Sequence, residues 1–202
     1  MVETGTQRKN IQILTGIGFI ISIGLLIFFK QHPTYFQVGG IFQSYLGQLG
    51  FFAPLIFVLL QVVQVVYPII PGGMTSVIGY IAFGPIWGFI YNFTGIFAGS
   101  LLAFGLARRY GETFAKAFVS QETYDKYVVY LDLNDGKFYA KFLGAAFALP
   151  GFPDDFLCMV SGLSKMTWKK FITIFLITKP VTLYIYTVVA YKGLNYLLTL
   201  FH

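Results

Sequence analysis

The 77 residues from 31 to 107 contain no aspartate, glutamate, lysine or arginine. A water-soluble domain needs charged side chains over its surface, and a stretch of this length has none to offer. Over the whole chain 56% of residues are hydrophobic and only 11% are charged. We therefore expect an all-α integral membrane protein, because a helix satisfies its own backbone hydrogen bonds in lipid. With 202 residues, the chain has room for one compact bundle and no separate soluble domain.

The rare residue types narrow the function. Cys158 is the only cysteine, which excludes an intrachain disulfide and a cysteine-based metal site. His32 and His202 lie outside the apolar blocks, so a zinc site or a protease histidine within the membrane is not expected. We expect no cofactor, no metal and no enzymatic activity, and nucleic acid is not an expected partner. One alternative stays open, because the adjacent carboxylates of Asp154 and Asp155 can together hold a metal ion.

Two segments of the chain look like copies of one membrane-entering element, 82 residues apart. Pro68 and Pro71 of the first copy correspond to Pro150 and Pro153 of the second. Proline-broken hydrophobic segments in corresponding positions of two halves indicate a transport site near the bilayer midplane. The same spacing relates Phe89 to Phe171, Ile90 to Ile172, Phe93 to Phe175, Leu101 to Leu183 and Gly111 to Gly193.

The N-terminal region predicts one crossing and one interfacial segment. Residues 11–29 are 19 residues without a charge, which is long enough to span the membrane. This run is longer than the hydrophobic region of a typical signal peptide and lacks a small-residue cleavage pattern, so we interpret it as a retained helix. Residues 38–49 carry apolar side chains at spacings of three and four, typical of an interfacial helix, although a loop with aromatic anchors has a similar pattern.

The next segment predicts a helical hairpin. Residues 51–67 form an apolar stretch that ends at Pro-Ile-Ile-Pro-Gly-Gly, where two prolines and two glycines cannot continue a helix. Residues 74–84 then precede another proline, and a helix of this length spans roughly 16 Å, about half a membrane. We therefore predict that 51–84 is a re-entrant hairpin that returns to the side it came from, with its tip lining a cavity. A full crossing at 86–107 follows.

The second half repeats this plan after a surface segment. Residues 112–136 mix five acids with basic residues and aromatic side chains at helical spacing, typical of one or two amphipathic helices on the membrane surface. Residues 138–149 begin a second hairpin, which turns at Pro-Gly-Phe-Pro-Asp-Asp and returns as a half-helix at 156–165. The last crossing, 171–191, is expected to be interrupted at Pro180.

The distribution of basic residues supports an inverted arrangement. With three full crossings, eleven lysines and arginines fall on one side and two on the other, as expected when basic residues near membrane ends face the cytoplasm. The two re-entrant hairpins then enter from opposite sides, so the repeats are inverted and their tips meet near the middle of the membrane. The expected parts are residues 1–49 (N-terminal helix and interfacial segment), 50–192 (a membrane domain with repeat one at 51–111, the surface segment at 112–136 and repeat two at 137–193) and a tail at 193–202.

Two groups of motifs make the chain resemble a known family. The first group contains Pro-Ile-Ile-Pro-Gly-Gly, then Phe-Gly-Pro-Ile-Trp-Gly-Phe at 83–89 and Ala-Arg-Arg-Tyr-Gly at 107–111. The second contains Pro-Gly-Phe-Pro-Asp-Asp at 150–155 and Ser-Gly-Leu-Ser-Lys-Met at 161–166, followed by a late aromatic residue. Over residues 50–192 the chain resembles the DedA superfamily, and more narrowly its VTT-domain branch, once called SNARE-associated.

The resemblance implies lipid transport across the bilayer. Members act as phospholipid scramblases in eukaryotic membranes and as transporters of polyprenyl phosphate or phospholipid in bacteria, some of them dependent on the proton gradient. We therefore expect a phospholipid scramblase or flippase; a proton-driven polyprenyl-phosphate flippase and a membrane scaffold without transport are the alternatives. The expected partners are membrane phospholipids or polyprenyl phosphate, and a homo-oligomer is compatible with the sequence. The expected location is the bacterial plasma membrane, as a multi-pass protein.

The predicted transport site combines both tips. At the first tip, backbone N–H groups at the start of the half-helix suit an anion. At the second, Asp155 is the favoured functional acid, whereas Asp154 more simply caps the half-helix. Lys179 either pairs with the acidic tip, binds phosphate or extends toward the membrane surface. The candidate transport residues are Pro68, Pro71, Gly72, Gly73, Thr75, Ser76, Pro150, Pro153, Asp154, Asp155 and Lys179, none of them catalytic.

Four further residues have simpler roles. Arg108 and Arg109 are candidate headgroup contacts, but anchoring the cytoplasmic end of a crossing is the plainer interpretation. Gly95 and Gly99 lie four residues apart, a spacing that favours close packing of two helices over ligand binding.

The sequence departs from the family pattern at two places. Many relatives carry an arginine three residues before the first proline of the second tip, where this chain has Phe147. The acid that some proton-dependent members place before the first tip is replaced here by the amides Gln61 and Gln64. These departures leave the coupling of transport to protons open.

Overall fold

The computed structural model describes residues 47–67, 72–116, 121–131, 137–149 and 152–200, together with the single positions 24, 31 and 44. All regular structure in this part is helical, with no β-strand in the described residues, which confirms the all-α class. The expected first crossing at 11–29 and most of the interfacial segment at 38–49 lie outside the described residues. The helices are α3 (Phe52–Val66), α4 (Gly72–Tyr110), α5 (Glu112–Lys116), α6 (Gln121–Val128), α7 (Lys137–Ala148), α8 (Asp154–Leu163) and α9 (Trp168–Leu200).

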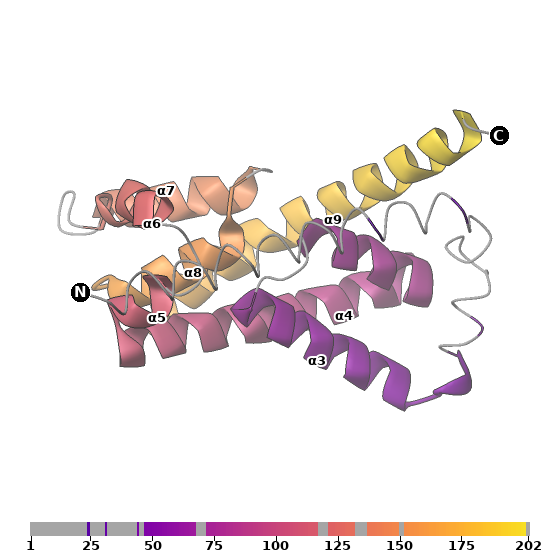
Figure 1. Ribbon diagram of the computed structural model, residues 1–202, viewed down its shortest axis with the longest axis horizontal. Helices are drawn as coiled ribbons and strands as arrows, with labels where there is room; N and C mark the ends of the chain where they lie inside the picture. The colour runs from indigo at the N-terminus through magenta and orange to yellow at the C-terminus, as the bar shows by residue number, and fades with distance from the viewer. Residues whose placement is uncertain are drawn as a thin grey trace.

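The first repeat is a helical hairpin followed by a long helix. Helix α4 is broken at Gly84, whose φ of 77° and ψ of 179° are accessible to glycine and strained for other residues. Because Pro85 follows directly, the chain reverses at this point, and α4 consists of two parts, 72–83 and 85–110. Figure 1 shows α3 running toward the middle of the molecule, 72–83 running back toward the side where α3 begins, and 85–110 running between them in this view. The predicted helix–break–helix order is therefore confirmed.

Glycines permit the close packing of this repeat. A Cβ atom at Gly88 would collide with the backbone of Gly79, where the two parts of α4 cross. A Cβ at Gly95 would collide with Gln61, and one at Gly99 would lie 2.7 Å from the Cβ of Val65. The prediction that Gly95 and Gly99 pack helices is confirmed, since both face α3 at contact distance.

The second repeat has the same order of parts. Helices α7 and α8 form the hairpin, and α9 is the long helix that follows. Helix α7 packs along α9, where the ring of Phe147 lies 5.6 Å from that of Phe175. Helix α8 packs instead against the first repeat, because Gly162 lets its backbone approach the carbonyl of Phe104 in α4. In the second hairpin, α7 therefore contacts the long helix of its own repeat, whereas α8 contacts the long helix of the first repeat.

The two long helices run in opposite directions. Two candidate membrane spans are long and apolar enough to cross a membrane: Thr75–Tyr110, which contains the part 85–110, and Trp168–Gly193. Phe89 lies 5.9 Å from Tyr184, while Phe104, farther along α4, lies 4.6 Å from Trp168 at the start of α9. A later residue of α4 thus contacts an earlier residue of α9, so the two helices are antiparallel. This is the relation that inverted repeats require.

Helix α9 corrects one prediction. The last crossing was expected to be interrupted at Pro180, but α9 continues through this proline from Trp168 to Leu200. Proline removes a single backbone donor, and long helices in membranes tolerate it when neighbouring groups compensate. The carbonyl that loses its donor is that of Leu176; the nearby hydroxyls of Thr178 and Thr182 donate to the carbonyls of Ile174 and Thr178, at 2.7 and 3.1 Å, and do not replace that bond. The predicted interruption is wrong because one missing hydrogen bond does not outweigh the packing of both ends.

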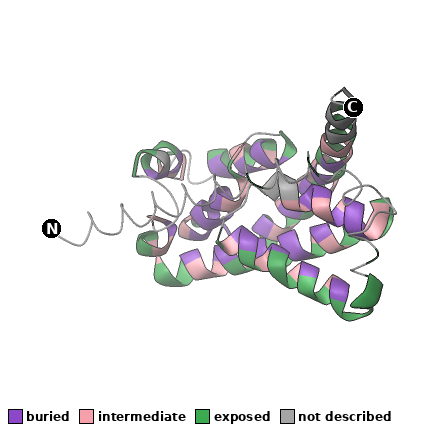
Figure 2. Cartoon of the chain, turned by 45° about the vertical axis from the view of Figure 1, so that its right-hand side comes forward, coloured by how far each residue is buried: buried purple, intermediate pink, exposed green. Residues whose placement is uncertain are grey.

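The surface carries apolar side chains on its outer helix faces. Leu59 and Val63 of α3 are more than half exposed, as are Val181, Ile185 and Val189 of α9. Figure 2 shows such exposed residues in green along the outer sides of the helices, with buried residues turned inward. An exposed leucine and valine face is costly in water and suits contact with lipid. The short helices α5 and α6 lie within the segment predicted to contain one or two surface helices.

Candidate transport site

Three charged side chains meet at the beginning of α8. The ammonium of Lys179, in the middle of α9, donates to the carboxylate Oδ2 of Asp154. Lys179 is only 8% exposed. Asp155 follows in the first turn of α8, where the charges of Lys179 and Asp154 both act on it. We call Asp154, Asp155 and Lys179 the charged cluster.

The local sequence explains the placement of the two acids. Pro153 occupies the position before the helix, so α8 starts at Asp154, two residues earlier than predicted. No side chain caps this helix end. The prediction that Asp154 caps α8 is therefore wrong: its carboxylate turns to Lys179, because a full positive charge attracts it more strongly than backbone N–H groups do. Both acids still lie beside the positive end of the helix dipole.

The ion pair leaves part of its charge unbalanced. The second oxygen of Asp154, Oδ1, is enclosed and has no hydrogen-bond partner among the described residues. The carboxylate of Asp155 likewise forms no ion pair with another described residue. Two carboxylates and one ammonium therefore share one partly enclosed place. Such an arrangement is costly in an apolar environment unless water or a ligand supplies the missing partners.

Lys179 lies beside Phe147, one of the positions at which the sequence departs from the family pattern. Its Nζ lies 5.3 Å from the ring centre of Phe147, the position at which the family resemblance places an arginine. A cation over an aromatic ring is stabilised by the ring's quadrupole. The positive charge is thus present in this part of the second hairpin, but it comes from α9 instead of α7. Of the placements considered for Lys179, the structure has the one that pairs it with the acidic tip.

The first hairpin contains an uncharged polar network. Gln61 of α3 donates through Nε2 to Oδ1 of Asn92, and Asn92 Nδ2 donates to the carbonyl of Ser76 at 2.8 Å. All three residues are at most 2% exposed. The network ties α3 to both parts of α4. Sequence reasoning singled out Gln61 and Ser76 but missed Asn92, although a lone asparagine in an apolar helix signals a buried partner.

Only some of the remaining candidate residues at the two tips are described by the structure. Pro68, Pro71 and Pro150 lie outside the described residues. Gly72 and Gly73 begin α4, and Thr75 is half-buried in its first turn. In Figure 1 the end of α3 and the start of α4 lie toward the middle of the molecule's length, as do the end of α7 and the start of α8. The described residues brought together at the site are therefore Pro153 and the charged cluster.

Arg108 lies at the opposite end of α8 from the charged cluster. Its Nε donates to the carbonyl of Gly162 at 3.1 Å, and its Nη2 donates to those of Ser164 and Met166 at 2.8 and 2.6 Å. Arg108 thus satisfies the free carbonyls where α8 ends. Arg109 is exposed and lies over the ring of Tyr110. Neither arginine is close to the tip, because the ten residues of α8 separate them from it by about 15 Å.

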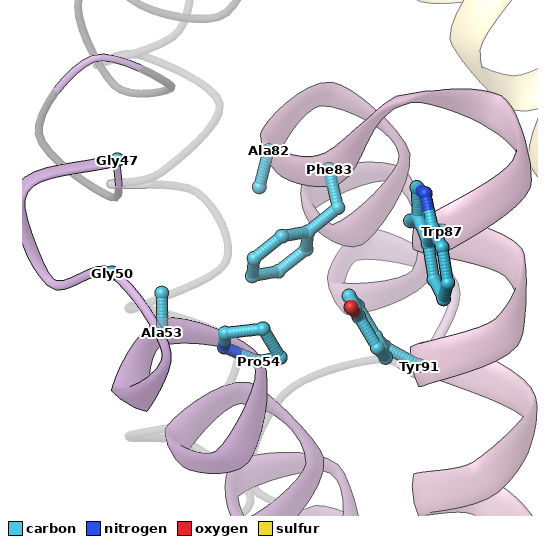
Figure 3. A pocket seen from close by; sticks show the side chains of 8 residues that line it. All are labelled: Gly47, Gly50, Ala53, Pro54, Ala82, Phe83, Trp87 and Tyr91. Carbon is cyan, nitrogen blue, oxygen red and sulfur yellow. The ribbon is translucent and has the colours of Figure 1, made fainter.

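A shallow pocket occupies the open end of the first hairpin. Its volume is about 290 Å³. Figure 3 shows Phe83, Trp87 and Tyr91 on one side of it and Pro54 on the other. No charged side chain lines it, and it lies far along the hairpin from the tip. We therefore place the candidate transport site at the charged cluster and not in this pocket. The lining residues are Gly47, Gly50, Ala53, Pro54, Ala82, Phe83, Trp87 and Tyr91.

Comparisons with known proteins support the resemblance read from the motifs. Residues 70–192 match the VTT domain. The chain is 31% identical over 149 residues to the "Uncharacterized membrane protein YhjE" of Bacillus subtilis (strain 168), an alignment that covers 73% of this chain and 68% of that protein. No solved structure is significantly similar to the chain.

Proposed function

Because this chain belongs to the VTT-domain family of membrane proteins, a branch of the DedA superfamily linked to membrane transport, we propose that it moves lipid across a cell membrane. The lipid headgroup passes between the hairpin tips, while its acyl chains stay in the bilayer. The observation that carries this proposal is the charged cluster within otherwise apolar helices. Ionisable residues inside membrane segments are costly, and they mark substrate or ion pathways.

Helix lengths support a re-entrant position for both hairpins. Helix α3 has 15 residues and α8 has 10, about 22 and 15 Å of helix, less than the roughly 30 Å of hydrocarbon. The parts 85–110 and 168–193 are each about 39 Å long, enough to cross with some tilt. In this arrangement the tips end inside the membrane, in a multi-pass protein.

The position of Lys179 agrees with a site at membrane depth. It lies eleven residues after Trp168 and fourteen before Gly193, the ends of the second candidate span, or about 16 and 21 Å along the helix. A lysine at that depth is too far from either surface for its head to reach water directly. Water within the protein or a bound headgroup then solvates the cluster, which is what a headgroup path requires.

The side chains favour passive movement without covalent chemistry. The first hairpin holds a neutral amide network where proton-dependent relatives are expected to place an acid, so one part of a proton relay is missing. Among the described residues, no group of three or more histidine, cysteine, aspartate or glutamate side chains is arranged to hold a metal ion. We therefore propose a scramblase and not an enzyme or a proton-driven pump.

Reconstitution into liposomes tests the proposal. Fluorescent phospholipids in both leaflets become accessible to a membrane-impermeant quencher only if the protein moves them. We expect complete accessibility without an imposed pH gradient, and a strong loss of rate in Lys179→Gln. The matched control is Lys116→Gln, which removes an exposed ion pair with Glu112 on α5. Movement only with a gradient indicates a driven flippase, and no movement of any lipid favours a scaffold.

A further inference from the structure

The charged cluster has a composition that restricts which headgroups it can accept. It contains two carboxylates but a single ammonium, so its net charge is negative when all three groups are ionised. Among the described residues, no other ion pair balances this excess. Arg108 is bound to carbonyls at the other end of α8, and Lys141 is exposed in the early part of α7, away from the tip.

We propose that the charged cluster selects zwitterionic phospholipids, whose headgroup carries both a phosphate and an ammonium, over lipids of net negative charge. This inference rests on the proposed lipid transport and names its substrate class. Lys179 releases Asp154 and binds the phosphate, while the headgroup ammonium lies between Asp154 and Asp155. The headgroup ammonium then lies against both carboxylates, the phosphate against Lys179, and the enclosed Oδ1 of Asp154 faces a positive charge, while the site keeps its single net negative charge.

An anionic headgroup leaves the same site worse balanced. The phosphate of phosphatidylglycerol or of polyprenyl phosphate can bind Lys179, but these headgroups carry no cation that could pair with the two carboxylates. Asp154 then loses Lys179, its ion-pair partner among the described residues, and two adjacent carboxylates face a third negative charge. Like charges brought together in an enclosed site are strongly disfavoured. We expect anionic lipids to move about tenfold more slowly than zwitterionic lipids, which corresponds to losing a single well-placed charge contact.

The first hairpin supports a division of roles in this selection. Its buried polar groups, Gln61 and Asn92, are neutral and hydrogen-bonded to each other. They are almost completely buried and carry no charge, so they do not distinguish headgroups by charge. The discrimination therefore depends on the charged cluster, and it should change when one carboxylate there is neutralised.

The test compares two tail-labelled lipids in one vesicle composition. The full-length protein is reconstituted in vesicles with either fluorescent phosphatidylcholine or fluorescent phosphatidylglycerol, and the rate of quencher accessibility is measured for each. We expect the wild type to move phosphatidylcholine about tenfold faster. Asp155→Asn should reduce this ratio toward one, mainly by accelerating phosphatidylglycerol, whereas Glu112→Gln on the surface should leave the ratio unchanged.

The outcomes separate this inference from the proposed function. Equal wild-type rates for the two lipids overturn charge selection and leave lipid transport standing. Movement of neither lipid overturns lipid transport itself. The wild-type ratio requires no variant, so a folding defect in Asp155→Asn does not affect it. Asp154→Asn provides a second test, and an unchanged ratio in both folded variants also overturns the inference.

Discussion

Arg108 offers the sharpest test of how the two repeats are joined. It is the last-turn residue of α4 that holds the end of α8 through three carbonyls, while its neighbour Arg109 makes no such contact. The two residues share the same helix end and the same charge. Replacing each with glutamine therefore separates the carbonyl contacts from the general effect of a positive charge beside the membrane.

The expected loss follows from the contacts. A hydrogen bond from a charged donor contributes about 1.5–3 kcal/mol when it is buried. Two of the three bonds of Arg108 are only partly buried and one is exposed, and one nitrogen serves two carbonyls, so we count about 2–3 kcal/mol in all. The guanidinium also lies 4.5 Å from the ring centre of Phe104, which adds about 0.5 kcal/mol. For Arg109→Gln we expect a change within about 0.5 kcal/mol.

Tryptophan fluorescence during heating in detergent measures this difference. Trp168 lies 4.6 Å from Phe104, next to the contacts in question. The other tryptophan, Trp87, is exposed and can be replaced by phenylalanine to leave one probe. In that background we expect Arg108→Gln to lower the apparent melting temperature by about 5–14 °C, at about 2–4 °C per kcal/mol for a chain of this size. Equal losses in both arginine variants would refute the reasoning, because charge alone would then explain the effect.

Three further predictions concern the first hairpin and the topology. Asn92→Leu should destabilise the protein by about 2–4 kcal/mol, because it removes the hydrogen-bond partner of the Gln61 amide and of the Ser76 carbonyl. Thr94→Val, on the exposed face, should change stability by less than about 0.5 kcal/mol. Melting curves compare the two variants, and equal effects would count against a stabilising role of the network. Gly88→Ala should abolish stable folding in size-exclusion chromatography, while Gly193→Ala, which meets open space, should elute as the wild type does. A cysteine at Gly193 should react with an impermeant thiol reagent only from outside the cell, since Cys158 is buried and gives little background; labelling only from the cytoplasm would contradict three crossings.

The sequence predicts the order of the helices well because local chemistry sets most breaks. The first hairpin was expected at 51–67 and 74–84, and the helices span 52–66 and 72–83. Prolines and glycines stop helices through their own geometry, so no knowledge of distant residues was needed. The exception is Pro180, where packing along the whole of α9 overrides one local signal.

The site was less predictable because it depends on contacts between distant segments. Asp154 carries an ordinary helix-capping signal, and only the approach of Lys179, 25 residues later, turns its carboxylate away. Asn92 gave no motif, yet it joins two segments that lie 31 and 16 residues from it. Sequence spacing along one helix cannot reveal partners that the fold supplies from another.

The two repeats are alike in backbone and different in chemistry. Position for position, Asp154 corresponds to Gly72, and Lys179 corresponds to Phe97. The first repeat therefore lacks both charges of the ion pair, and the buried network of its hairpin is made by two amides and a backbone carbonyl. If the hairpins face each other across a headgroup path, one wall is neutral and the other is charged. A headgroup crossing the membrane then meets its strongest electrostatic interactions on the second hairpin, so substitutions there should change which lipid moves, while substitutions in the first should change mainly how stably the path is held.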